Sequence, residues 1–202
     1  MESARVDERD GPGRRKGTMG GRMLEGERVR LRELRRSDLP VIVEHYNDED
    51  VVRFLAFWDG PFGEDDAEAF YERNLGQPRE SRALAVERLE DGAFLGTLGL
   101  HRVSWRERKA SLGVALWDPG AHDKGHGTEA LGLLLVYAFD VLNMHRVELT
   151  VFAYNERAIR VYEKLGFVQE GRRRDAWYWD GEYHDVWDMG LLRPEWEKLR
   201  QA

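Results

Sequence analysis

The sequence predicts a mixed α/β domain of the α+β type, in which helices cover the faces of a sheet. Runs of alternating polar and apolar residues follow one another across short turns such as Asp91-Gly92 and Asp180-Gly181, which favours antiparallel pairing of neighbouring strands. Two helical segments stand between later strands, which implies a crossover connection near the middle of the sheet. Together these patterns predict a mixed sheet.

The first half of the domain opens with a strand and a capped helix. Arg28–Leu34 alternates polar and apolar residues, as a half-buried strand does. Ser37 and Asp38 can cap a helix that carries Pro40 in its first turn and runs to about Asn47. Beyond an aromatic loop, we expect a helix over 64–75 and strands over 83–88, 94–103 and 110–117.

The second half begins after a breaker-rich loop over 118–127. Thr128–Leu142 is apolar on nearly all sides, which predicts a buried helix. A strand follows, and then an amphipathic helix over Asn155–Leu165 that ends at Gly166. The expected strands of this half cover 147–152, 167–179 and 182–191.

Length and composition fit one globular domain with a tail. The chain has 202 residues, of which 42% are hydrophobic and 34% charged. Residues 1–22 are rich in Arg and Gly and nearly free of large apolar side chains, so we expect a flexible N-terminal tail. Residues 23–202 are expected to form the single domain.

Several classes of protein are excluded or disfavoured. The chain has no cysteine, which excludes a disulfide framework, a cysteine-ligated metal and a thiol nucleophile. A net charge of −7 disfavours nucleic acid and anionic membranes as partners. No apolar run is long enough to span a bilayer, and no secretory signal is seen, so we expect a cytoplasmic protein without a metal.

The segment that runs from Lys124 to Ala130 carries the first chemical signal. It leads from a strand into the buried helix, whose first turn has unpaired N–H groups and the positive end of the helix dipole. Gly125 and Gly127 would let an anion approach those N–H groups closely. The pattern predicts a phosphate cradle, with an ordinary glycine-rich turn as the alternative.

Three kinds of phosphate site compete for this loop. A Walker loop fails, because His126 and Gly127 stand where Lys and Ser or Thr are required. A dinucleotide fingerprint fits Gly125, Gly127 and Ala130, with Glu148 about 20 residues on, but it belongs in an opening strand–helix–strand unit rather than behind antiparallel strands. The third candidate is a pyrophosphate site for coenzyme A.

Two stretches resemble the GCN5-related N-acetyltransferases (GNAT). One is Gly113–Pro119 followed by Lys124–Ala130, and the other, more specific, is Asn155–Phe167. The resemblance covers the chain from about Gly26 and is strongest to ribosomal-protein N-terminal (RimJ/RimL-like) and polyamine acetyltransferases. It implies a seven-stranded, mostly antiparallel sheet with splayed central strands. It also implies acetyl-CoA as co-substrate, direct transfer to a primary amine in a ternary complex, and, by analogy, a homodimer.

The resemblance also assigns the coenzyme site. The backbone of the glycine loop would hold the pyrophosphate, and main-chain groups of Val114, Ala115 and Leu116 would bind the pantetheine arm. His122 departs from the Gln or Arg that is usual in the family, whereas Lys124 and His126 could add positive charge. The remaining expected contacts are Asp123, Gly125, Gly127, Thr128 and Asn155, and Asn155 could equally be a helix N-cap.

Tyr162 matches the family position of the general acid, which protonates the leaving thiolate, and the alternative is a tyrosine that only packs on the amphipathic helix. The general base stays open. The strand before the loop carries no carboxylate, and Ser111 cannot replace one directly, so Glu148, His101 or a water chain are the candidates. This gap leaves a second hypothesis, a degenerate module that senses acyl-CoA without turnover.

Aromatic residues in two regions suggest an acceptor pocket. With acidic residues nearby they would suit a cationic amine such as a protein N-terminus, a polyamine or an aminoglycoside. The alternative is that they belong to the core or to a dimer interface. The two groups are Phe54, Phe57, Trp58 and Phe62 in the first region, and Trp177, Tyr178, Trp179, Tyr183 and Trp187 in the second.

Overall fold

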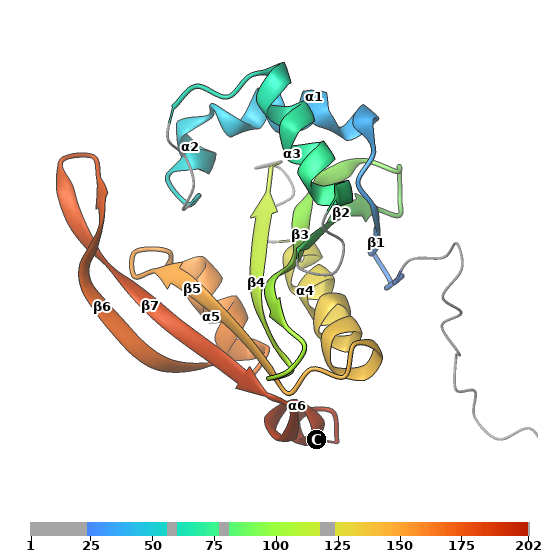
Figure 1. Cartoon of the computed structure of the whole chain (residues 1–202), viewed down its shortest axis with the longest axis vertical. Coiled ribbons are helices and arrows are strands. Elements are labelled where there is room, and N and C mark those ends of the chain that lie inside the picture. The colour runs from blue at the N-terminus through green and yellow to red at the C-terminus, as the bar shows by residue number, and fades with distance from the viewer. Residues whose placement is uncertain (1–23, 56–59, 77–80, 118–123, 202) are drawn as a thin grey trace, which may run out of the picture.

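The computed structural model describes residues 24–55, 60–76, 81–117 and 124–201. It contains a seven-stranded mixed sheet, as the sequence and the resemblance predict, and its strands stand in the order β1-β2-β3-β4-β5-β7-β6 (Figure 1). The β4–β5 pair is parallel and the other neighbours are antiparallel. The strands are β1 (Val29–Glu33), β2 (Arg82–Arg88), β3 (Phe94–Ser104), β4 (Lys109–Leu116), β5 (Arg146–Phe152), β6 (Val168–Trp179) and β7 (Glu182–Leu192).

The four predicted helices are present, with different ends. The first begins as a 3-10 turn, η1, and the long apolar helix ends as a π-helical turn, η3. The short helices α2 and α6 were not predicted. The bounds are η1 (Arg36–Asp38), α1 (Leu39–Tyr46), α2 (Glu49–Val52), α3 (Glu64–Gly76), α4 (His126–Val136), η3 (Tyr137–Val141), α5 (Glu156–Lys164) and α6 (Arg193–Leu199).

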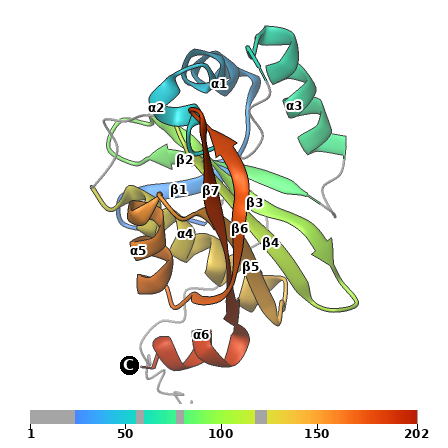
Figure 2. The ribbon, with the colours of Figure 1, turned by 90° about the vertical axis from the view of Figure 1, so that its left-hand side faces the viewer.

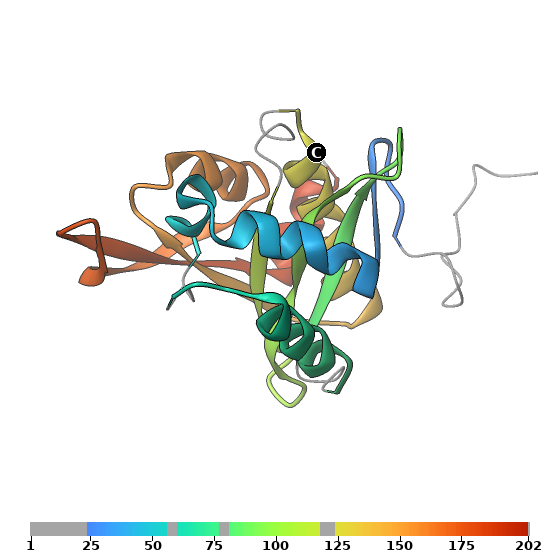
Figure 3. The same cartoon turned by 90° about the horizontal axis from the view of Figure 1, so that it is seen from above.

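Helices cover both faces of the sheet. α4 and α5 pack on one face (Figure 2), where their apolar side chains meet Leu98, Leu112 and Leu149 in the larger hydrophobic cluster. α1 and α3 lie across the other face (Figure 3), where Ile42 packs with Ala85 and Trp117. Within the described residues, no helix is both long and apolar enough to cross a bilayer.

A buried ionic network fixes the start of α1 to the sheet. Arg32 on β1 pairs with Asp38 at 2.7 Å and with Glu87 on β2, and Arg30 adds a second pair to Glu87. Burial alone would raise the pKa of Glu87, but the hydrogen bonds from the two arginines outweigh it and hold that pKa below its ordinary value. The network sets the position of α1, and α2 follows directly after it.

The sheet divides at its parallel junction. β4 and β5 pair only where Lys109, Ala110 and Ser111 meet Arg146, Val147 and Glu148. Beyond those three rungs the strands diverge (Figure 1), so the facing edges of Leu112–Leu116 and Leu149–Phe152 have no strand partner on that side. The splayed central strands that the resemblance implies are therefore confirmed.

Candidate active site

A cleft of about 1070 Å³ occupies the divergence of β4 and β5. Residues from both faces of the sheet line it, because the gap between the strands connects the two faces. Eight residues expected from the sequence are among them: Val114, Ala115, Leu116, Gly125, Gly127, Thr128, Asn155 and Tyr162. The fold therefore brings most of the expected coenzyme contacts and the expected acid together.

The glycine loop forms the N-terminus of α4. Gly125 is the N-cap residue and has φ = +81°, a left-handed conformation that favours glycine. A Cβ at Gly127 would lie only 2.9 Å from Leu116 Cδ1. Gly125 thus permits the backbone turn, and Gly127 permits the close approach of α4 to β4. The N–H groups of the first turn of α4 then lie at the edge of the cleft.

The basic residues next to these glycines, Lys124 and His126, do not line the cleft. Lys124 is exposed and His126 is buried, with 6% of its surface accessible, and neither lines the cleft. The expected side-chain charge beside the phosphates therefore has no support from their placement. His122 and Asp123 lie outside the described residues.

Glu129 has a role that sequence reasoning missed. Its place in the first turn of α4 indicates a favourable charge at the helix N-terminus, but its carboxylate also accepts hydrogen bonds from the backbone N–H groups of Glu27 and Arg28. It thereby joins the chain just before β1 to the first turn of α4. The contact spans about half of the sequence, and no local pattern indicates it.

Val114–Leu116 on β4 are hydrogen-bonded to β3 on one side and face the gap on the other. Their backbone groups on the open edge are the ones that an extended ligand can pair with, as an added strand would. This arrangement fits the main-chain role expected for these three residues.

Asn155 combines its two expected roles without conflict. Its side-chain oxygen accepts a hydrogen bond from Ala158 N at 3.2 Å, which caps α5. Within the described residues the side-chain NH₂ group has no partner, and the residue lines the cleft. The cap therefore leaves the amide donor available to a ligand.

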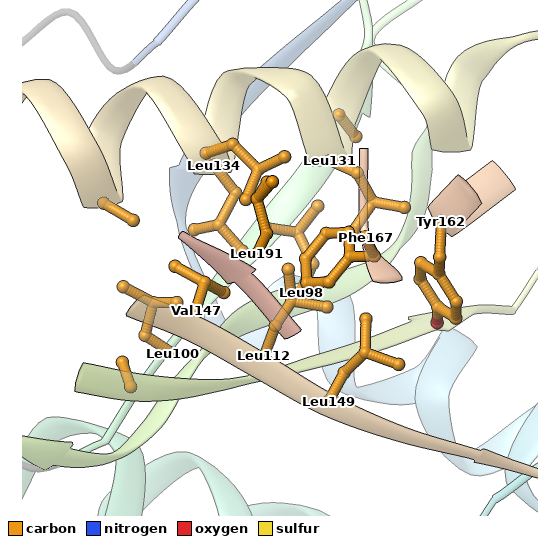
Figure 4. Packing of buried hydrophobic residues seen from close by; sticks show 14 of the residues in the cluster. Leu98, Leu100, Leu112, Leu131, Leu134, Val147, Leu149, Tyr162, Phe167 and Leu191 are labelled. Atoms are coloured by element: carbon orange, nitrogen blue, oxygen red, sulfur yellow. The ribbon is translucent and has the colours of Figure 1, made fainter. Parts of the chain in front are cut away.

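Tyr162 hangs from α5 into the gap. Figure 4 shows its ring beside Leu149, with the hydroxyl oxygen directed toward the strands. The residue is 6% exposed, and in the described part of the chain its hydroxyl has no hydrogen-bond partner. Burial raises the pKa of Tyr162 to about 12, so the phenol is protonated at neutral pH.

Basic residues on α5 also line the cleft, and the sequence analysis did not single them out. Arg157 and Lys164 are exposed and form no ion pair within the described residues, whereas Arg160 pairs with Glu156 at 3.3 Å. Their spacing along one side of the helix was visible in the sequence and could have indicated this positive edge.

The three side chains that bear on the general base share one rung of the sheet. His101 on β3 is in register with Ser111 on β4, and Ser111 is in register with Glu148 on β5. Side chains in register point to the same face, here the face opposite α4 and α5. All three line the cleft.

Of the aromatic residues expected to form an acceptor pocket, those that the structure describes lie in three places: the cleft, the hydrophobic core and the surface. Phe54 and Trp177 line the cleft, and Phe152 stacks on Trp177 with ring centroids 4.7 Å apart. The other described members lie elsewhere: Phe62 and Trp179 pack in the smaller core, Trp187 packs against the larger one, and Tyr178 and Tyr183 are exposed. Phe57 and Trp58 fall outside the described residues.

Comparison with known families decides what this arrangement is. The sequence model of the acetyltransferase (GNAT) domain matches residues 28–168, which is most of the chain. The chain belongs to the GNAT acetyltransferases. The seven-stranded, mostly antiparallel sheet agrees with this membership.

Individual GNAT relatives agree in sequence. The chain is 37% identical over 110 residues to a putative ribosomal N-acetyltransferase of Bacillus subtilis, a match that covers 54% of this chain and 59% of that protein. It is 26% identical over 167 residues to a spermidine N(1)-acetyltransferase of Vibrio cholerae, covering 82% and 94%. The corresponding Escherichia coli enzyme is 29% identical over 180 residues, covering 86% and 91%.

A solved GNAT structure agrees in fold. The spermidine N-acetyltransferase of Vibrio cholerae, in complex with CoA and spermine, superposes with a TM-score of 0.75 at 26% identity and covers 84% of this chain and 98% of that one. The protein is therefore an N-acetyltransferase that transfers acetyl groups to amines. The alternative of a sensor without turnover has no observation in its favour.

Proposed function

We propose that acetyl-CoA binds in the cleft with its thioester in the gap between β4 and β5, and that a primary amine attacks it there directly. The single observation that carries this proposal is the divergence of the two strands after three rungs, with Tyr162 buried at the opening. In this proposal the α4 N-terminus holds the pyrophosphate and Val114–Leu116 pair with the pantetheine arm, which their position along the cleft supports.

The basic residues along one side of α5 support the same orientation of the bound coenzyme. Arg157 and Lys164 line the cleft without an ion-pair partner among the described residues, so they can offer charge to the coenzyme's phosphates. The Asn155 amide stands at the start of the same helix and can donate a hydrogen bond to the coenzyme.

Tyr162 acts in this proposal as the general acid. When the tetrahedral intermediate collapses, the C–S bond breaks and the thiolate takes the hydroxyl proton of Tyr162. Burial raises the pKa of this phenol to about 12, so it carries its proton when the thiolate leaves.

The acceptor in this proposal is a polyamine or a protein N-terminus, the classes to which the named relatives point. Asp50 lines the cleft and pairs only loosely with Arg53, at 3.9 Å, so it can meet a cationic amine. Phe54 and Trp177 also line the cleft and offer aromatic surface to the carbon chain of the acceptor, while the Arg53 guanidinium covers the Phe54 ring at 4.7 Å from its centroid. The requirement for acetyl-CoA supports a cytoplasmic location. A homodimer is part of the proposal by analogy alone.

Calorimetry with acetyl-CoA tests the coenzyme site. Gly127→Trp should abolish binding, because even a Cβ there meets Leu116 at 2.9 Å. Gly132→Ala is a matched control on the same helix, since a Cβ there meets nothing within 4 Å. It should bind acetyl-CoA as the unchanged protein does. Equal binding by both variants would refute the proposed cradle.

Thiol release in the presence of candidate amines tests the acceptor. Spermidine and a short peptide with a free N-terminus represent the two classes, and the N-terminally blocked peptide is the control. Turnover with either amine supports the proposal and chooses between the classes. Turnover with the blocked peptide alone would refute a primary amine as acceptor.

A further inference from the structure

His101 stands at an irregular point of β3, beside the gap in the sheet. It is the last residue in regular register with β4, because the pairing shifts by one residue between His101 and Ser104. Arg102, in that shift, has φ = +51°, which is unusual for a residue with a side chain. Such bulges re-aim side chains and are frequent beside active sites.

The imidazole lies against the backbone of β4. A Cβ at Gly113 would be 3.4 Å from His101 Cε1, an ordinary contact distance, so the ring lies directly over this position of the strand. The ring lines the same cleft as Tyr162 but from the opposite face of the sheet. In the described part of the chain it has no hydrogen-bond partner.

We propose that His101 is the general base that takes the proton from the acceptor's ammonium group. The inference rests on the proposed placement of the thioester in the gap. Base and acid then lie on opposite faces of the sheet, with the reacting carbonyl between them. Asp50 and His101 line the same cleft, so an amine bound there is open to both side chains.

The proton balance is simple. A ring nitrogen of His101 accepts one proton from the ammonium group, and the neutral amine attacks the thioester carbonyl to form the C–N bond. As the C–S bond breaks, the thiolate takes the proton of Tyr162, and the substrate nitrogen gives its second proton through water to the tyrosinate. One proton is released to water for each acetyl group moved, after the imidazolium and the tyrosine return to their starting states.

The groups that face His101 favour a neutral ring. Burial lowers the pKa of the imidazole below its ordinary value, and the neighbouring Arg102 lowers it further. Ser111 on β4 faces it in register and carries no charge. Asp50 on α2 lines the same cleft and is strongly exposed. A ring that is neutral at pH 7 can accept a proton.

Glu148 is less suited to this step. Its carboxylate pairs with Arg146 at 3.0 Å, so a proton and a guanidinium would compete for it. Arg146 in turn binds Glu170, and Gly190 makes room for that pair, since a Cβ there would lie 2.8 Å from the Arg146 guanidinium. This ionic arrangement stabilises Glu148 as an anion and keeps it engaged.

The test is the pH dependence of kcat/KM for one amine acceptor. His101→Gln should lower the rate at pH 7 about 100-fold, as the loss of a general base does. The deficit should shrink as the pH rises, because the amine then loses its proton to water. Acetyl-CoA affinity, measured by calorimetry, should stay unchanged. His145→Gln, an exposed histidine just before β5, is the matched control and should keep the full rate.

Two further variants make the outcome decisive. With His101→Ala, added imidazole should restore part of the rate. Glu148→Gln should keep the acid limb of the pH profile. Two results would overturn the inference and leave the acetyltransferase assignment intact. One is a rate for His101→Gln within threefold of that of the unchanged protein. The other is an acid limb of the pH profile that disappears only in Glu148→Gln. An inactive unchanged protein that still binds acetyl-CoA would overturn both.

Discussion

The carboxylate of Glu129 accepts a hydrogen bond from the backbone N–H of Arg28, 2.9 Å away and separated by 101 positions in the chain. Gly26 permits this contact, because a Cβ there would lie 2.1 Å from the carboxylate oxygen. The Arg28 guanidinium reaches back to Lys124 O, at 3.5 Å. The segment before β1 and the loop before α4 therefore hold each other, and the proposed pyrophosphate cradle depends on a part of the chain far from its motif.

Glu129→Ala should weaken both stability and coenzyme binding. It removes the acceptor of two backbone N–H groups, which costs about 1 kcal/mol of unfolding free energy. Denaturant unfolding and calorimetry measure the two effects. Glu163→Ala, an exposed position on α5, is the control and should change neither. Unaltered acetyl-CoA affinity in Glu129→Ala would show that this anchor does not shape the cradle.

Substitutions of Asn155 can separate its role as a helix cap from its proposed contact with the coenzyme. Asn155→Asp keeps an oxygen that can accept from Ala158 N but loses the NH₂ donor, whereas Asn155→Ala loses both. We expect Asn155→Asp to keep its unfolding free energy and to bind acetyl-CoA more weakly. Asn155→Ala should also lose about 1 kcal/mol of stability. If Asn155→Asp binds acetyl-CoA normally, the residue is only a helix cap.

Tyr162 predicts a distinctive pH profile. Its pKa of about 12 means that the phenol stays protonated below roughly pH 11, so kcat should show no alkaline decline from this group between pH 7 and 10. Tyr162→Phe should lower kcat about 100-fold with little change in acetyl-CoA affinity. An alkaline limb near pH 9 that vanishes in Tyr162→Phe would contradict the assigned pKa.

Glu87 predicts an acid sensitivity of the fold. Its pKa is lowered in the folded state, so the stability it contributes is present above its unfolded pKa and is lost as the pH falls through the lowered value. Glu87→Gln should lower the unfolding free energy by about 3 kcal/mol, because Arg32 is left buried with one partner fewer. It should also flatten the decline of stability below pH 5.

The control for this variant is an exposed pair. Glu107→Gln breaks the pair with Lys109 at the turn between β3 and β4, where both side chains meet solvent. Its unfolding curve should match that of the unchanged protein. If Glu107→Gln lowers the unfolding free energy as much as Glu87→Gln does, burial of the Arg32 network is not the cause of the destabilisation.

The strands and long helices were predictable because their signals are local. Alternation marks strands such as β1 and β5, Gly125 marks the start of α4, and Gly166 marks the end of α5. α6 also had a local signal that was overlooked: Pro194 stands in its first turn, and Glu195 accepts from Leu192 N at 2.8 Å. Four-residue α2 is too short for periodicity to reveal.

The remaining features depend on contacts between distant segments. The π turn at the end of α4 meets Arg193, which donates to the carbonyl groups of Phe139 and Met144, and no sequence window contains both partners. The same holds for the shared rung of His101, Ser111 and Glu148, which requires the register of three strands. The sequence indicated His101 and Glu148 as candidates for the general base. The strand register and the bulge in β3 are what favour His101 over Glu148, and neither can be read from the sequence.

The three-rung junction between β4 and β5 has a consequence for solubility. A sheet normally has two outer edges, here β1 and β6, where unpaired backbone groups can recruit foreign strands. The divergence adds two more edges in the interior of this sheet, along β4 and β5. A ligand that pairs with these edges protects them, so a preparation kept saturated with acetyl-CoA should resist aggregation longer than one stripped of it.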